Sequence, residues 1–188
     1  MTRTLQALLL LVGLAAATPA LAQSRGYYGG PQRYRTYPNN ALRLEIGGAT
    51  VATEECGGGP CFDNTRWGAL VFGADFDLGL GGPVNLTLGA REVASSSFSG
   101  NPSIFEPSIG LTFKFARFAP VEPRFGAGLA VLVGDNGDSG AALRVGGGLS
   151  FFGYAPIGLA IDLALEIGQI GGITISQAQF LIGPEFRF

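Results

Sequence analysis

The chain closes with Gln179-Phe180-Leu181-Ile182-Gly183-Pro184-Glu185-Phe186-Arg187-Phe188, and the alternation in this segment is the most informative feature of the sequence. In an extended strand, successive side chains point to opposite faces. One face therefore carries Phe188, Phe186, Pro184, Ile182 and Phe180, and the other carries Arg187, Glu185, Gly183, Leu181 and Gln179. A soluble β-sandwich rarely ends its final strand in this way. The alternative is an apolar edge strand of a soluble β-protein.

This ending resembles the C-terminal signal of Gram-negative outer-membrane β-barrels, in which apolar residues alternate before a terminal aromatic residue. The family often has a polar residue where Leu181 stands, so the sequence departs from the pattern there. The resemblance implies a transmembrane barrel and an assembly signal that is read by the barrel-assembly machinery. The residues that match the signal are Phe180, Ile182, Phe186 and Phe188.

The start of the chain has the three parts of a secretory signal peptide. Arg3 precedes the apolar run 5–17, and an Ala-x-Ala cleavage site lies just before Gln23. The apolar run is shorter than the ~20 residues that a spanning helix needs. We expect residues 1–22 to be removed on export, and we expect no transmembrane helix in the mature chain.

The composition is typical of a membrane-embedded β-protein. Charged residues make up 14% of the chain, hydrophobic residues make up 47%, and there are 31 glycines. A soluble domain usually carries ~25% charged residues, whereas an outer-membrane barrel shows apolar side chains to lipid and keeps its few charges inside. Loss of Arg3 with the signal peptide takes the net charge from −2 to −3, which argues against nucleic-acid binding. The mature length suits one domain.

Two cysteines, Cys56 and Cys61, flank a glycine-rich segment. In an exported protein this spacing predicts a disulfide that closes a small surface loop. A metal site at this pair is disfavoured, because two ligands are too few and the chain contains no histidine.

The segment 23–40 differs from the rest of the mature chain. Between Ser24 and Pro38 it carries three arginines, four tyrosines and no aliphatic side chain. Such a segment cannot bury apolar surface, so we expect a disordered arm in the periplasm. Its arginines and tyrosines suit a weak contact with an envelope glycan, although a solvated leader is the simpler interpretation.

From Ala41 onward, apolar and polar residues alternate in eight segments that are separated by turn residues. One face of the clearest segment is wholly aliphatic and carries Ile157, Leu159, Ile161, Leu163, Leu165 and Ile167. A helix would scatter these side chains around its axis, so the period of two predicts strands. Strands of ~10–14 residues cross a bilayer when they are tilted. The segments are 41–53, 66–80, 84–94, 104–116, 123–133, 141–152, 157–168 and the ending from 173.

The predicted fold is all-β: an eight-stranded antiparallel up-and-down transmembrane β-barrel over residues 41–188. In architecture and terminal signal, these residues resemble the OmpA-type small outer-membrane barrels. The resemblance implies a monomer in the cell outer membrane that contacts lipid and lipopolysaccharide. The turns expected on the periplasmic side are 81–83, 117–122 and 153–156. The loops expected on the extracellular side are 54–65, 95–103, 134–140 and 169–172.

The polar face of the segments predicts a charged lumen. Eight strands enclose an interior that side chains can fill, and charges away from bulk water must be paired. The predicted members of lumen ion pairs are Arg43, Glu45, Asp75, Asp77, Arg91, Glu106, Lys114, Arg124, Arg144, Asp162, Glu166, Glu185 and Arg187. Since the first and last segments pair on closure, one group is expected close together near the periplasmic end: Arg43, Glu45, Glu185 and Arg187. A similar height is expected for Asp75, Asp77, Lys114 and Arg124.

The sequence offers little for catalysis. Without histidine, the Ser-His-Asp arrangement and the usual metal ligands are absent. Asp75 and Asp77 could in principle do acid-base work, but we interpret them as arginine partners. Segment 135–138 matches a calcium loop poorly, and the glycines at 146–148 lack the strand-to-helix context of a phosphate cradle. We therefore expect no catalytic, cofactor-binding or metal-ligating residue, and no enzyme.

Three functions remain open. The first is a structural or surface role with a lumen that is plugged by charge. The second is an adhesin or ligand-binding surface antigen that acts through the extracellular loops, although the longest predicted loop has only about a dozen residues. The third is a narrow channel or transporter for small molecules, in which the lumen charges form a gated conductance or a ligand pocket.

Overall fold

The computed structural model describes residues 40–55, 62–95, 103–115, 119–135, 137–152 and 155–188. The predicted signal peptide and nearly all of the predicted arm lie outside these residues, as do Cys56 and Cys61 with their predicted disulfide. No helix in the described part of the chain is long and apolar enough to cross a membrane.

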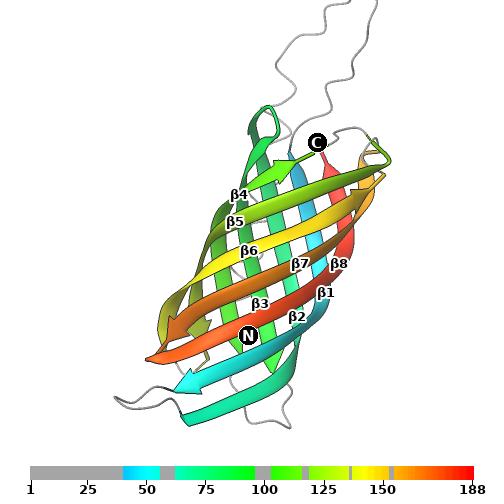
Figure 1. Cartoon of the computed structure of the whole chain (residues 1–188). Coiled ribbons are helices and arrows are strands. Elements are labelled where there is room, and N and C mark those ends of the chain that lie inside the picture. The colour runs from blue at the N-terminus through cyan, green and yellow to red at the C-terminus, as the bar shows by residue number, and fades with distance from the viewer. Residues whose placement is uncertain (1–39, 56–61, 96–102, 116–118, 136, 153–154) are drawn as a thin grey trace, which may run out of the picture.

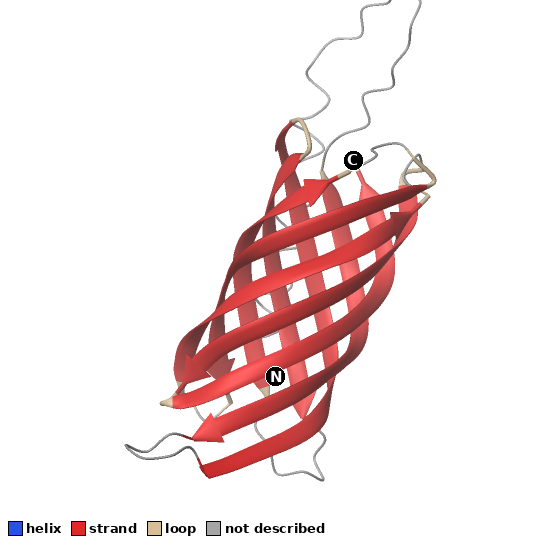
Figure 2. Cartoon of the chain, viewed as in Figure 1, coloured by secondary structure: helices blue, strands red, loops and turns tan. Residues whose placement is uncertain are grey.

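The described residues form eight strands that close into one antiparallel barrel (Figures 1 and 2). Each strand pairs with its neighbours in the sequence, and β8 closes the sheet against β1. The predicted fold class is confirmed. The strands are β1 (Ala41–Glu55), β2 (Phe62–Gly81), β3 (Val84–Ser95), β4 (Ile104–Lys114), β5 (Val121–Gly134), β6 (Ser139–Phe151), β7 (Ile157–Ile170) and β8 (Ile173–Arg187).

The strands are staggered around the barrel, and the stagger goes with their tilt. The stagger can be measured by moving from Ala41 on β1 to its register partner on β2, and then from strand to strand around the barrel. One full circuit returns to β1 at Val51, ten residues beyond the starting point. Figure 1 shows the resulting oblique course of the strands. Ala41 lies opposite Arg187, so the start of β1 and the end of β8 share one rim of the barrel.

The outer face of the barrel is apolar and the lumen holds buried charges, which reverses the usual arrangement of a soluble protein. Large aliphatic side chains of the outer face are well exposed, with Leu163 at 62% and Leu129 at 61%. Charged side chains such as Arg43 and Glu185 are buried in the lumen. The alternation of side chains along each strand places the two sets on opposite faces of the sheet.

Several strands are longer than predicted. β2 begins at Phe62, several residues before its predicted start. β5 begins at Val121, two residues before its predicted start. The predicted loop 54–65 is therefore wrong at both ends, because the β1–β2 ladder continues through polar pairs such as Thr53 and Thr65. The other predicted loops also lose residues to strands at their ends. Apolar periodicity marks only part of each strand, whereas backbone pairing extends beyond it.

The β7–β8 connection is a two-residue turn. Ile170 and Ile173 pair directly, and Gly171 and Gly172 between them have φ values of +56° and +85°. Two consecutive positive φ values match a type I′ hairpin turn, in which a side chain would be strained.

Two ladders are interrupted beside prolines. The β4–β5 ladder skips residues 106–107, and the β1–β8 ladder skips residues 44–45 opposite Gly183 and Pro184. Proline has no backbone N–H to donate to a ladder, which accounts for a gap at each position.

Candidate functional site

The lumen near the rim at which β1 begins holds a connected set of charges, which we call the rim network. Each member lies within 4.0 Å of an oppositely charged partner, and none has a side chain more than 14% exposed. Such burial makes every unpaired charge costly. The members are Arg43, Glu45, Asp75, Asp77, Arg91, Lys114, Glu122, Arg124, Asp162, Glu185 and Arg187.

Arg43 lies at the centre of the rim network. Its guanidinium donates to Asp77 at 2.5 Å and to Asp75 at 3.4 Å. Its Nε atom is 3.5 Å from Glu45 Oε1. The register places Asp75 on β2 directly opposite Arg43 on β1, and Asp77 follows two residues further along the same face.

Arg91 on β3 and Lys114 on β4 contact carboxylates that Arg43 also contacts. Arg91 donates to Glu45 at 2.8 Å and to Asp75 at 2.6 Å. Lys114 Nζ lies 2.9 Å from Asp77 Oδ2, and this is its only ion pair within the described residues. Asp77 thus has two cations within ion-pair distance, whereas Lys114 has one carboxylate at that distance within the described residues.

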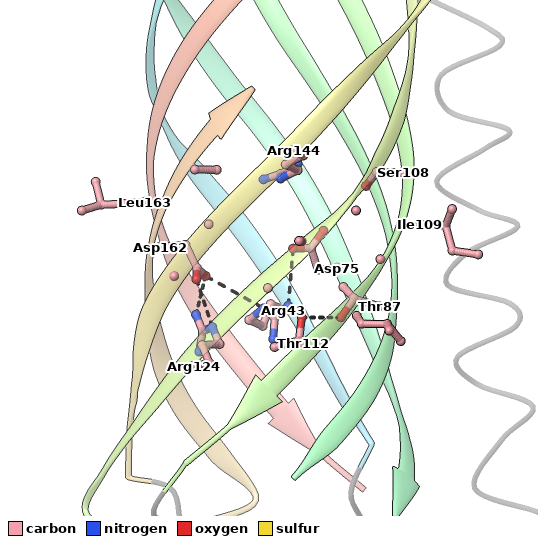
Figure 3. Close-up of a pocket in the computed structure, with 18 of the residues that line it drawn as sticks. Arg43, Asp75, Thr87, Ser108, Ile109, Thr112, Arg124, Arg144, Asp162 and Leu163 are labelled. Atoms are coloured by element: carbon pink, nitrogen blue, oxygen red, sulfur yellow. Dashed lines mark hydrogen bonds and ion pairs between the residues drawn. The ribbon is translucent and has the colours of Figure 1, made fainter. Parts of the chain in front are cut away.

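A second group of charges gathers around Arg124 on β5. Arg124 Nε donates to Asp162 Oδ1 at 3.0 Å, and Nη2 donates to Oδ2, so the contact is bidentate. Arg124 Nη1 also reaches Glu185 Oε2 at 3.3 Å and donates to Ser150. Figure 3 shows Asp162 between Arg124 and Arg43, and a distance of 4.0 Å from Arg43 Nε to Asp162 joins the two groups.

The four residues predicted to lie close together, Arg43, Glu45, Glu185 and Arg187, all belong to the rim network. Their ion-pair partners, however, are not simply the residues opposite them in the ladder. Arg43 and Glu185 are register partners on β1 and β8. Arg43 nevertheless turns toward β2, while Glu185 lies 2.8 Å from Arg187 and 2.5 Å from Ser150 Oγ. Glu45 pairs with Arg91 across the lumen.

Glu122 is a lumen residue that the sequence analysis missed. It is 3% exposed, and its carboxylate lies 3.4 Å from Arg187 Nη2. The predicted turn 117–122 includes Glu122, because Pro123 is the predicted start of the strand. The signal was present, since Glu122 precedes Arg124 by two residues and therefore shares its face.

Further along the barrel lies a set of polar residues that we call the middle layer: Glu106, Arg144, Glu166, Gln177 and Gln179. Glu106 is fully buried and accepts hydrogen bonds from the amides of Gln177 and Gln179, the second at 3.0 Å. Arg144 and Glu166 lie directly opposite each other on β6 and β7. Within the described residues, however, Arg144, Glu106 and Glu166 form no ion pair, although ion pairs were expected for all three.

Beyond the middle layer, toward the opposite rim, the lumen is filled by aliphatic side chains, which we call the apolar layer. Val51, Val71, Val93 and Leu132 are wholly excluded from solvent. The layer occupies inward positions toward the far ends of the strands, which the alternation of side chains indicates, whereas the predicted lumen residues are all charged. The buried members are Ala49, Val51, Val71, Val93, Ile104, Ala130, Leu132, Ala142 and Ile175. Leu181 belongs to the same buried cluster but lies on the rim-network side of Gln179 on β8.

An interior cavity of about 80 Å³ lies between the rim network and a glycine-rich part of the wall. Arg43, Arg144 and Asp162 border it on the charged side (Figure 3). The inward glycines of β4, β5 and β6 leave this space unfilled, and it can hold a few water molecules. Those glycines are Gly110, Gly126, Gly128 and Gly146.

The residues of the predicted assembly signal lie on the outer face. Phe180 is 50% exposed and Ile182 is 37% exposed. Phe188 stacks on Phe76 of β2, with ring centroids 6.0 Å apart. Phe186 pairs with Leu42 of β1 in the ladder that closes the barrel.

No protein-family model and no curated protein sequence matches the chain. Solved structures do match. Neisserial surface protein A has a TM-score of 0.58 at 13% identity, covering 79% of this chain and 99% of that one. The outer membrane protein OprG from Pseudomonas aeruginosa has a TM-score of 0.57 at 10% identity, covering 81% and 97%. The N-terminal β-barrel domain of Pseudomonas aeruginosa OprF has a TM-score of 0.53 at 15% identity, covering 81% and 100%.

The chain has the fold of a small outer-membrane β-barrel. At these identities the likeness concerns the fold and does not extend to a ligand or an activity.

Proposed function

We propose that this chain is an integral protein of the outer membrane with a structural or surface role, and that its lumen is closed to solutes. The main support for a closed lumen is that two barriers lie in series along it. The rim network closes one end of the interior with paired charges, and the apolar layer fills the other end. We also propose that the barrel is of the OmpA type and has no enzymatic activity.

The outer face supports the membrane location. Ile157, Leu165 and Ile167 on β7 are each about 60% exposed on one face of a single strand. At ~25 cal/mol per Å², an aliphatic surface of this extent would be strongly unfavourable in water and is favourable in lipid. The strands have 11 to 20 residues, enough to cross a bilayer at a tilt.

The interior supports a closed lumen. In the apolar layer, Leu132, Val51 and Val93 are fully buried, so a hydrated ion would have to displace packed aliphatic groups. In the rim network, an entering solute would have to break buried ion pairs such as that between Arg43 and Asp77. An eight-stranded barrel is narrow enough for side chains to fill its interior.

Planar-bilayer recording of the refolded barrel tests the proposal. We expect no stable single-channel conductance from wild-type protein whose barrel is verified by heat-modifiable gel mobility. We also expect the protein in the outer-membrane fraction of cells. A stable open channel would overturn the closed lumen, and recovery in the soluble periplasm would overturn the membrane role.

A second candidate function is a narrow channel, and one observation favours it. The cavity of about 80 Å³ and the unpaired groups around Arg144 leave part of the lumen unfilled. Conduction would still require the apolar layer to open. Replacement of Val71 and Val93 by serine should then raise conductance strongly, whereas in a permanently closed barrel it should only lower stability.

A further inference from the structure

Four buried hydrogen-bonding atoms of the middle layer lack a partner among the described residues. Both carboxylate oxygens of Glu166, Oε1 of Gln179 and Nη1 of Arg144 are buried and have no hydrogen-bond partner within the described residues. Glu166 is 3% exposed and Gln179 is 2% exposed. Buried polar groups are rarely left in this state, so a missing partner is indicated at this level of the lumen.

The orientation of Gln179 shows which kind of partner is missing. Its amide nitrogen donates to Glu106 Oε2 at 3.0 Å and to Gln177 Oε1 at 3.4 Å. The nitrogen is thus occupied, and the oxygen is left as a free acceptor. Glu166 adds two more acceptors, since it lies opposite Gln177 in the β7–β8 ladder and therefore diagonal to Gln179.

The composition of the middle layer is rich in acceptors. Two of its five residues, Glu106 and Glu166, carry buried carboxyl groups. The guanidinium of Arg144 is the only cationic group among the five. Arg144 lines the cavity beside the rim network (Figure 3), and it makes no ion pair with Glu166 although the two residues are register partners.

We propose that the middle layer binds one small monovalent cation of the Na⁺ or K⁺ class. The carboxylate of Glu166 and the carbonyl oxygen of Gln179 are its protein ligands, and water completes the shell. Oxygen ligands of this kind suit hard cations. The site is separate from the rim network, and it does not require that the lumen conducts.

The stability of the refolded barrel in different salts tests the site. The protein is refolded in Na⁺, in K⁺ or in N-methylglucamine at one fixed ionic strength, because exchange through a closed lumen is expected to be slow. N-methylglucamine is too large for the layer and reports general screening. Urea unfolding is then followed for wild type, Glu166→Gln and Gln179→Met. Glu92→Gln on the outer face of β3 is the matched control.

We expect Na⁺ or K⁺ to raise the folding equilibrium constant of wild type by roughly tenfold over N-methylglucamine, the factor for a cation at about ten times its Kd. The effect should vanish in Glu166→Gln, shrink in Gln179→Met and persist in Glu92→Gln. Equal stability of wild type in all three salts would overturn the proposal. So would an unchanged salt effect in Glu166→Gln.

The variant Arg144→Gln excludes the rival explanation that Arg144 swings back to neutralise Glu166. If it does, the wild type needs no cation, and a cation effect appears only when Arg144 is replaced. That result would also overturn the proposal. If the cation site exists, the wild type already shows the effect, and Arg144→Gln strengthens it.

Discussion

Asp77 and Glu185 offer a matched comparison of how much a buried ion pair matters in this lumen. Both side chains are fully buried. Replacement of Asp77 by asparagine leaves Lys114 without its only ion pair in the described chain. Replacement of Glu185 by glutamine leaves each of its ion-pair partners with another carboxylate, because Arg124 keeps Asp162 and Arg187 keeps Glu122.

The expected losses of unfolding free energy differ accordingly. Asp77→Asn strands a buried ammonium and should cost about 3–5 kcal/mol if the lumen is dry. Glu185→Gln mainly weakens charged hydrogen bonds and should cost about 1.5–3 kcal/mol. The double variant Asp77→Asn with Lys114→Met removes both charges, and Arg43 retains Asp75 and Glu45. It should therefore recover most of the loss, because a buried pair can be replaced at little cost.

Urea unfolding in lipid vesicles measures these differences, with the single tryptophan of the chain as a fluorescence probe. The double-mutant cycle isolates the coupling between Asp77 and Lys114. A loss for Asp77→Asn no larger than that for Glu185→Gln, or no recovery with Lys114→Met, would contradict this dependence of Lys114 on Asp77. Losses below about 1 kcal/mol in both single variants would mean that water screens the network.

Three further predictions follow from the structure. Deletion of Phe188 should cost little in detergent, about 0.5–1.5 kcal/mol for one aromatic pair, but should sharply reduce the amount assembled in cells, measured by surface labelling; equal surface levels would contradict this. Gly148→Ala should lower stability by about 1–3 kcal/mol, because its new methyl group meets the Asp162 carboxylate, whereas Gly48→Ala meets only ordinary contacts and should be neutral in the same urea assay. Leu132→Ala should cost about 2–5 kcal/mol by leaving a cavity in the apolar layer, and a loss similar to that of an exposed leucine would show that the layer is loosely packed.

The architecture was predictable from the sequence because a transmembrane barrel imposes a strict period of two. The segment from Ile157 to Ile167 alternates without exception, and the strand there begins where predicted. Boundaries were less predictable. Apolar alternation marks where side chains meet lipid, whereas pairs such as Glu54 with Asn64 extend the ladder with polar residues. Pro123 was misleading for a related reason, because a proline within a strand does not have to mark its start.

The partners inside the lumen were harder to predict than its composition. Alternation states which residues point inward, but the pairing of inward residues depends on the stagger of the sheet and on the reach of each side chain. A stagger of ten residues brings Gln177 of β8 level with Val51 of β1, and long side chains then let Gln177 reach Glu106 on the far side of the barrel. The same geometry separates the polar middle layer from the rim network, so a nearly balanced count of charges did not guarantee that each charge has a partner. Arg144 and Glu166 illustrate the point, since they are perfect neighbours in register and yet form no ion pair. The cation site that we propose consists of residues of this kind, for which counting charges failed.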